Sequence, residues 1–112
     1  MIIGLLGFGT IGAGVYELAR QQQNLQVRYV LDIREIGVPE LTHQISDILE
    51  DPEVDTVVEV LGGLHPSYEF VSAALRAGKN VVTANKYLVA TYFEELTTLA
   101  RKTGAAFRCT AA

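Results

Sequence analysis

Apolar and polar residues follow two periodic patterns along this chain, and each pattern predicts a different element. Short apolar runs predict β-strands, and apolar residues spaced three or four positions apart predict amphipathic helices. The predicted strands cover residues 2–6, 26–31, 55–61, 80–83 and 105–109. The predicted helices cover residues 10–22, 45–50, 88–103 and a segment that starts at Pro66 and stops at Gly78.

Helices alternate with strands over the whole length, which predicts parallel strands joined by right-handed crossovers. The nearly continuous apolar run at 55–61 is typical of a strand buried on both faces of a parallel sheet. Segment 35–42 contains Gly37 and Pro39 and is predicted to be a loop. We therefore expect a doubly wound α/β sheet of about five strands, in one domain over residues 1–112.

The spacing of apolar residues also predicts which side of each helix is buried. In the first helix the predicted inner face holds Ile11, Val15, Leu18 and Ala19. In the helix after Pro66 it holds Phe70, Val71, Ala74 and Leu75. In the last helix it holds Leu88, Tyr92, Leu96 and Leu99.

Composition narrows the classes of function. The formal net charge of −4 disfavours nucleic-acid binding, and no apolar run reaches the length of a membrane span. The single cysteine, Cys109, excludes an internal disulfide, and we expect it to be a small buried residue in a strand. Neither histidine has metal-ligand spacing, so no metal site is expected. These features are typical of a cytoplasmic protein.

The most informative motif is Gly7-Phe8-Gly9-Thr10-Ile11-Gly12, which directly follows the first predicted strand. In this GxGxxG pattern, Gly7 allows a tight turn, Gly9 lets the backbone approach a pyrophosphate, and Gly12 lets the helix pack closely. The phosphates then bind at the N-terminus of the helix, where N–H groups and the helix dipole favour an anion. A strand before the motif and a helix after it predict a Rossmann-type, dinucleotide-binding fold.

Asp32 and Arg34 are the candidates for choosing between NAD and NADP. Asp32 stands twenty residues after Gly12, at the end of a strand, where a carboxylate can accept hydrogen bonds from the adenosine ribose and favour NAD. Arg34 can instead bind a 2′-phosphate and favour NADP. Alternatively, Asp32 is a solvated turn residue and Arg34 an exposed surface charge.

Two further segments follow strands that should end at the same edge of the sheet. Gly62 and Gly63 let the backbone approach the nicotinamide half of a cofactor, or simply serve a loop with positive φ. Thr83 and Asn85 offer polar groups to the cofactor. Lys86 offers a cation for a carboxylate, an oxyanion or a phosphate, or a proton for a reacting carbonyl, unless it is a solvated lysine.

Three ordered segments together resemble the opening domain of homoserine dehydrogenases. They are residues 7–15, residues 55–63 and, most closely, Ala74-Leu75-Arg76-Ala77-Gly78-Lys79-Asn80-Val81-Val82-Thr83-Ala84-Asn85-Lys86. The resemblance covers nearly the whole chain and implies reversible reduction of aspartate semialdehyde to homoserine with NADPH or NADH, a step toward threonine and methionine. It implies that Thr10 and Ile11 contact the pyrophosphate, and that Thr83 and Lys86 line the nicotinamide end.

The same resemblance implies that the main catalytic lysine and aspartate of the family lie in a substrate domain outside these residues. This chain alone is then expected to bind a dinucleotide without catalysing a reaction, and the full-length protein to be a homo-oligomer. Two departures from the family stand out. Asp32-Ile33-Arg34-Glu35 replaces an Arg-Asp pair, and Thr110-Ala111-Ala112 replaces a Glu-Ala-Ser type segment.

Two alternatives remain open from the sequence. The chain can be a dinucleotide-sensing module without catalytic function, although a lysine at the nicotinamide end has no evident purpose there. It can also belong to a related amino-acid or semialdehyde dehydrogenase with another substrate.

Overall fold

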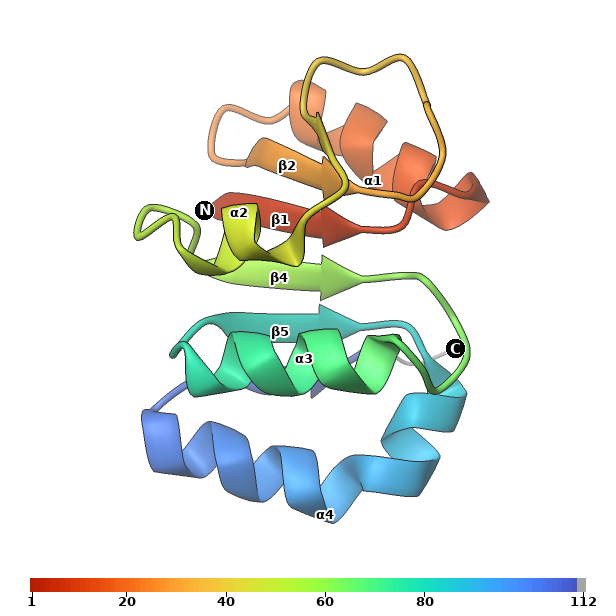
Figure 1. Ribbon diagram of the computed structural model, residues 1–112. Helices are drawn as coiled ribbons and strands as arrows, with labels where there is room; N and C mark the ends of the chain where they lie inside the picture. The colour runs from red at the N-terminus through yellow and green to blue at the C-terminus, as the bar shows by residue number, and fades with distance from the viewer. Residues whose placement is uncertain (111–112) are drawn as a thin grey trace.

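A computed structural model describes residues 1–110 as a single parallel sheet covered by helices (Figure 1). The sheet has six strands in the order β3-β2-β1-β4-β5-β6, and every neighbouring pair is parallel. The strands are β1 (Ile2–Leu6), β2 (Gln26–Leu31), β3 (Leu41–Thr42), β4 (Thr56–Glu59), β5 (Asn80–Thr83) and β6 (Phe107–Cys109). The helices are α1 (Thr10–Arg20), α2 (Ile45–Leu49), α3 (Ser67–Arg76) and α4 (Lys86–Thr103).

This strand order is that of the Rossmann-type, doubly wound sheet, so the predicted fold class is confirmed. The order reverses between β1 and β4, because the chain first builds outward through β2 and β3 and then crosses to the other side. In Figure 1 the arrowheads of β1, β2, β4 and β5 point the same way, so their carboxyl ends form one edge of the sheet. Ligands of such sheets bind outside this edge, beside the point of reversal.

The expected number of strands was one too low. The additional strand, β3, lies in the segment predicted to be a loop, where Leu41 pairs with Val30 and Thr42 with Leu31. A strand of two residues is too short to show an alternating pattern. The expectation for Ala111 and Ala112 lies outside the described residues.

The sheet separates two hydrophobic clusters. Under α1, the smaller cluster contains Ile3, Leu5, Tyr16, Ala19, Val27 and Val30. The larger cluster joins the sheet to α2, α3 and α4 through Leu6, Leu31, Ile48, Val54, Val57, Val71, Ala74, Leu75, Val81, Leu88, Leu96 and Ala100. The predicted inner residues of α3 and α4 all belong to this larger cluster or pack against it.

The predicted inner face of α1 was partly wrong. Ile11 and Leu18 are 60% and 55% exposed, and the buried residues are Gly12, Tyr16 and Ala19. Tyr16 takes the inward position because its ring packs edge-on against Phe8, with 5.4 Å between centroids. The expectation of a buried Cys109 was also wrong, since this residue is exposed on the edge strand β6.

Candidate functional site

The glycine turn between β1 and α1 leaves no room for a side chain at two positions. Gly7 has a φ of +101°, a conformation that residues with a Cβ disfavour. A Cβ on Gly12 would lie 2.2 Å from the carbonyl oxygen of Gly7, so only glycine lets α1 start this close to β1. At Gly9, in contrast, a Cβ would meet no atom within 4 Å. The turn is therefore closely packed at Gly7 and Gly12, whereas the space beside Gly9 is open.

The N-terminus of α1 lies at this open surface. Gly9 is the N-cap and makes no side-chain hydrogen bond to the helix, and no acidic residue stands in the first turn. Thr10 and Ile11 are both exposed. Because the first N–H groups of a helix have no partner within it, this end of α1 presents donors and a positive dipole to an anion.

Asp32 and Arg34 form a closed pair beside the turn. Arg34 Nε and Nη2 donate to Oδ1 and Oδ2 of Asp32, each at 2.9 Å, and the N–H of Phe8 donates to Oδ2 at 3.1 Å. The Arg34 side chain, helped by hydrogen bonds from the backbone N–H groups of Arg34 and Phe8, holds the pKa of the Asp32 carboxyl well below its usual range. Asp32 is 7% exposed and the Arg34 side chain 60%, so the pair presents a cation to solvent.

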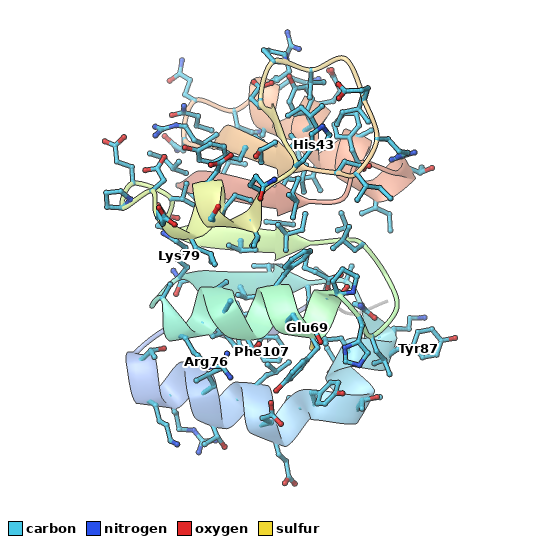
Figure 2. The ribbon with its side chains drawn as sticks, in the orientation of Figure 1. His43, Glu69, Arg76, Lys79, Tyr87 and Phe107 are labelled. Carbon is cyan, nitrogen blue, oxygen red and sulfur yellow. The ribbon has the colours of Figure 1, made fainter. Side chains whose placement is uncertain are left out.

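A cavity of about 250 Å³ lies next to this pair, between the carboxyl ends of β2 and β4. His43, labelled in Figure 2, lies on its wall with Nδ1 2.6 Å from the carbonyl oxygen of Asp32 and Nε2 3.0 Å from Glu35 Oε1. These two acceptors raise the pKa of His43. The remaining lining is mostly apolar: Leu31, Ile33, Leu61, Gly62, Pro66 and Phe70. Such a lining suits a flat, largely apolar ring.

Glu59, the last residue of β4, was not among the site residues predicted from the sequence. Its side chain is fully buried, and Oε2 accepts hydrogen bonds from the N–H groups of Leu61 (3.0 Å) and Gly62 (3.3 Å). Gly62 and Gly63 follow with φ values of +80° and +73°. An acidic residue within a strand predicted to be buried on both faces was the available signal, because a charge there needs hydrogen-bond partners.

Thr83 and Asn85 direct their side chains toward the same buried carboxylate. Thr83 Oγ1 donates to Glu59 Oε1, and Asn85 Nδ2 donates to Glu59 Oε2 at 3.4 Å and to the carbonyl of Gly63. Asn85 also caps α4, since its Oδ1 accepts from the N–H of Leu88 at 3.1 Å. Both side chains are therefore engaged inside the protein, and their predicted contacts with a cofactor stay predictions.

Lys86, the first residue of α4, is exposed at a second cavity. This cavity measures about 240 Å³ and is lined by Ala84, Asn85, Lys86, Val89, Ala90, Cys109 and Thr110. A cation in the first turn of a helix is opposed by the helix dipole, so Lys86 would be stabilised by an anion bound in this cavity. The predicted site residues thus form two groups, one around Asp32 and one around Glu59 and Lys86.

Residues 7–110 match the family of homoserine dehydrogenase NAD-binding domains. The chain belongs to this family. Homoserine dehydrogenase from Bacillus subtilis is 38% identical over an alignment that covers 91% of this chain and 27% of the relative. That from Corynebacterium glutamicum is 46% identical over an alignment that covers 84% of this chain and 24% of the relative.

Solved structures of homoserine dehydrogenases have the same fold. The Thiobacillus denitrificans structure aligns with a TM-score of 0.88 at 35% identity, covering 97% of this chain and 29% of that one. The Staphylococcus aureus structure at pH 8.5 aligns with a TM-score of 0.84 at 32% identity, covering 97% and 31%. The chain thus has the sequence and the fold of the homoserine dehydrogenase NAD-binding domain family, and it spans about 27% of the length of the Bacillus subtilis relative.

The residues present fit the cofactor of this homoserine dehydrogenase domain. The open surface above Gly9 and the uncapped start of α1 suit a pyrophosphate, and the apolar cavity beside Asp32 suits an adenine ring. Over residues 1–110, no group of His, Cys, Asp and Glu residues is arranged to hold a metal ion. Within the same residues, no helix is long and apolar enough to cross a membrane.

Proposed function

We propose that the protein containing this domain reversibly reduces aspartate semialdehyde to homoserine with NAD(P)H, and that this domain holds the cofactor without being active alone. The observation that carries the proposal is that the glycine turn, Asp32 and Lys86 lie along one edge of the sheet. Asp32 lines one cavity at this edge and Lys86 lines the other. A dinucleotide lying along this edge can reach from the Asp32 cavity, past the start of α1, toward Lys86.

Each group of residues has a separate task in this proposal. Gly7, Gly9 and Gly12 shape the turn that receives the pyrophosphate, and Thr10 and Ile11 bring their N–H groups to it. The nicotinamide ring supplies the hydride when it is bound. Gly62, Gly63, Thr83 and Asn85 form the support below that ring. Lys86 binds an anionic group of the cofactor or the substrate and is the only candidate catalytic residue proposed within this domain.

The Asp32–Arg34 pair leads us to propose NADPH as the preferred cofactor. Asp32 already accepts four hydrogen bonds, from the backbone N–H groups of Phe8 and Arg34 and from Arg34 Nε and Nη2. A ribose diol would have to displace the guanidinium to reach this carboxylate. A 2′-phosphate, in contrast, binds the exposed side of Arg34 while the pair stays intact.

The remaining parts of the proposal concern the whole protein. The domain covers residues 1–112, and the substrate domain with the main catalytic lysine and aspartate lies outside them. Hydride transfer needs a substrate held against the cofactor, so separation of the two domains abolishes it. We further propose that the full-length protein is a cytoplasmic homo-oligomer.

Two measurements test this function. Titration of the isolated domain with NADPH and NADH, followed by nucleotide fluorescence, should give saturable binding with tighter binding of NADPH. Oxidation of homoserine with NADP⁺ should be detectable only with the full-length protein. Absence of binding by both nucleotides would contradict the proposal, and tighter binding of NADH would contradict the choice of cofactor.

A further inference from the structure

Glu59 is a buried carboxylate to which the proposed function assigns no task. It is the last residue of β4, between Leu6 of β1 and Thr83 of β5, and its side chain is 0% exposed. Within residues 1–110 it takes part in no ion pair. Burial of a carboxylate without a cation is costly, so such a group persists only where several hydrogen bonds replace water.

Five neutral donors surround this carboxylate. Oε2 accepts from the N–H groups of Leu61 and Gly62, from Ser67 Oγ at 3.1 Å and from Asn85 Nδ2, while Oε1 accepts from Thr83 Oγ1. An ionised carboxylate is an acceptor only and can accept about four hydrogen bonds in good geometry. The backbone N–H groups of Leu61 and Gly62 can only donate and therefore need the acceptor that Glu59 provides, whereas Ser67 Oγ can also donate to the carbonyl oxygen of Gly62 at 3.3 Å.

The donors come from four different segments, and all four lie at the edge of the sheet where the cofactor is expected. They belong to the loop after β4, the start of α3, the end of β5 and the N-cap of α4. Secondary hydrogen bonds extend the network: Thr83 Oγ1 accepts from the N–H of Asn85 at 3.0 Å, and Asn85 Nδ2 reaches the carbonyl of Gly63. Glu59 thus links the Gly62–Gly63 loop to the residue that precedes Lys86.

We propose that Glu59 is a positioning residue for the nicotinamide half of the dinucleotide, an inference that rests on the proposed cofactor-binding function. Glu59 holds the Gly62–Gly63 loop and the start of α4 in one fixed arrangement, so that both sides of the nicotinamide site are formed before the cofactor arrives. Glu59 reaches the proposed adenosine site at one wall only, through Leu61 and Gly62, which also line the cavity beside Asp32. The hydrogen bonds of Asp32 and Arg34, which shape the rest of that site, do not involve Glu59.

The test compares two ligands on the isolated domain by calorimetric titration. NADPH carries both halves, and 2′-phospho-ADP-ribose lacks only the nicotinamide ring. Glu59→Gln places an NH₂ group among donors and leaves at least one of them without an acceptor. We expect its affinity for NADPH to fall by about tenfold, while its affinity for 2′-phospho-ADP-ribose changes by less than about twofold.

Lys79→Met is the matched control. Lys79 is also buried, but it lies just before β5, at the opposite end of the sheet from Tyr87, the residue that follows Lys86 in α4 (Figure 2). Its Nζ donates to the carbonyls of Asp51 (2.8 Å) and Val54 (2.7 Å). Its loss should lower the melting temperature and leave both affinities unchanged. Asn85→Ser is a second test variant, because serine retains the helix cap but loses the Nδ2 contacts with Glu59 and Gly63. It should reproduce the selective loss even if Glu59→Gln does not fold.

Each outcome is decisive. Selective weakening of NADPH binding by Glu59→Gln or Asn85→Ser, with Lys79→Met unaffected, supports the positioning role. Equal weakening of both ligands, or no weakening in either variant, overturns it and leaves Glu59 a structural residue. If the wild-type domain binds neither ligand, the proposed function itself fails, and the inference fails with it.

Discussion

Arg34 stands between Asp32 and the solvent, joined to the carboxylate by two side-chain hydrogen bonds of 2.9 Å. The order of the two groups matters for a ligand, because the first charge it meets is positive. Asp32 would be read from the sequence alone as a ribose acceptor, whereas in the folded chain its oxygens are already occupied.

Arg34→Leu should therefore weaken NADPH binding and spare NADH binding. Loss of a charged contact with a 2′-phosphate corresponds to a decrease of roughly tenfold or more in affinity. Removal of the guanidinium also uncovers Asp32, so the affinity for NADH should stay equal or increase. Parallel fluorescence titrations measure both. The control is Arg101→Leu in the last turn of α4, and a decrease for both nucleotides with Arg34→Leu would contradict the assignment.

The same pair makes stability depend on pH in a defined direction. Arg34 lowers the pKa of Asp32 in the folded state, so the folded chain binds fewer protons than the unfolded chain at acidic pH. The stabilisation is complete above the unfolded pKa, roughly 4, and declines as the pH falls below it. The difference in the free energy of unfolding between wild type and Arg34→Leu should shrink between about pH 5 and about pH 2 in urea titrations. A difference that grows toward acidic pH would contradict this relationship.

Gly12→Ala should damage the glycine turn, because the new Cβ would lie 2.2 Å from the carbonyl oxygen of Gly7. Displacement of α1 should cost about 1–3 kcal/mol of stability and abolish most dinucleotide binding. Gly14→Ala is the matched control in the same helix, where the added Cβ meets no atom within 4 Å. It should raise stability by about 0.5–1 kcal/mol. Thermal unfolding and nucleotide titration of the two variants check this contrast, which equal behaviour would refute.

Lys86→Ala should separate binding from stability. Removal of a cation from the first turn of α4 relieves an unfavourable interaction with the helix dipole, so the melting temperature should stay the same or increase slightly. Affinity for NADPH should fall several-fold if the ammonium contacts the cofactor. Lys102→Ala, in the last turn of the same helix, should leave affinity unchanged. An unchanged affinity in Lys86→Ala would assign the lysine to the substrate or to the surface.

The parts of this site that the sequence predicted are those encoded within one local segment. The glycine turn and the spacing from Gly12 to Asp32 follow from residues close together in the chain, and the strand–helix alternation predicted the sheet. The covering of Asp32 by Arg34 depends on a rotamer, and the Glu59 network joins residues up to 26 positions apart. Neither leaves a periodic signal, although an acidic residue in a buried strand was a visible anomaly.

The error on α1 has a different cause. Apolar residues at positions 11, 15 and 18 suggested one face, but only Val15 packs against the core. Ile11 stands in the first turn, where a cofactor would contact the helix, and Leu18 is exposed near the other end of α1. The hydrophobic pattern records what is buried without distinguishing burial in the core from contact with a ligand. Tyr16 further obscured the pattern, because its ring belongs to the core while its hydroxyl donates to Glu40 Oε1 at 2.8 Å.

The unequal division of the core gives the two faces of the sheet different local stabilities. Among residues 1–110, α1 is the one helix over the first face, with Tyr16 and Ala19 as its buried hydrophobic residues, whereas α3 and α4 pack against each other over the second face. The local opening that exposes an amide hydrogen should therefore cost less free energy in α1 than in α3, so amide hydrogens of α1 should exchange faster. A ligand whose phosphates are held by the first turn of α1 stabilises the more weakly packed face, so its occupancy is measurable as slowed exchange in α1.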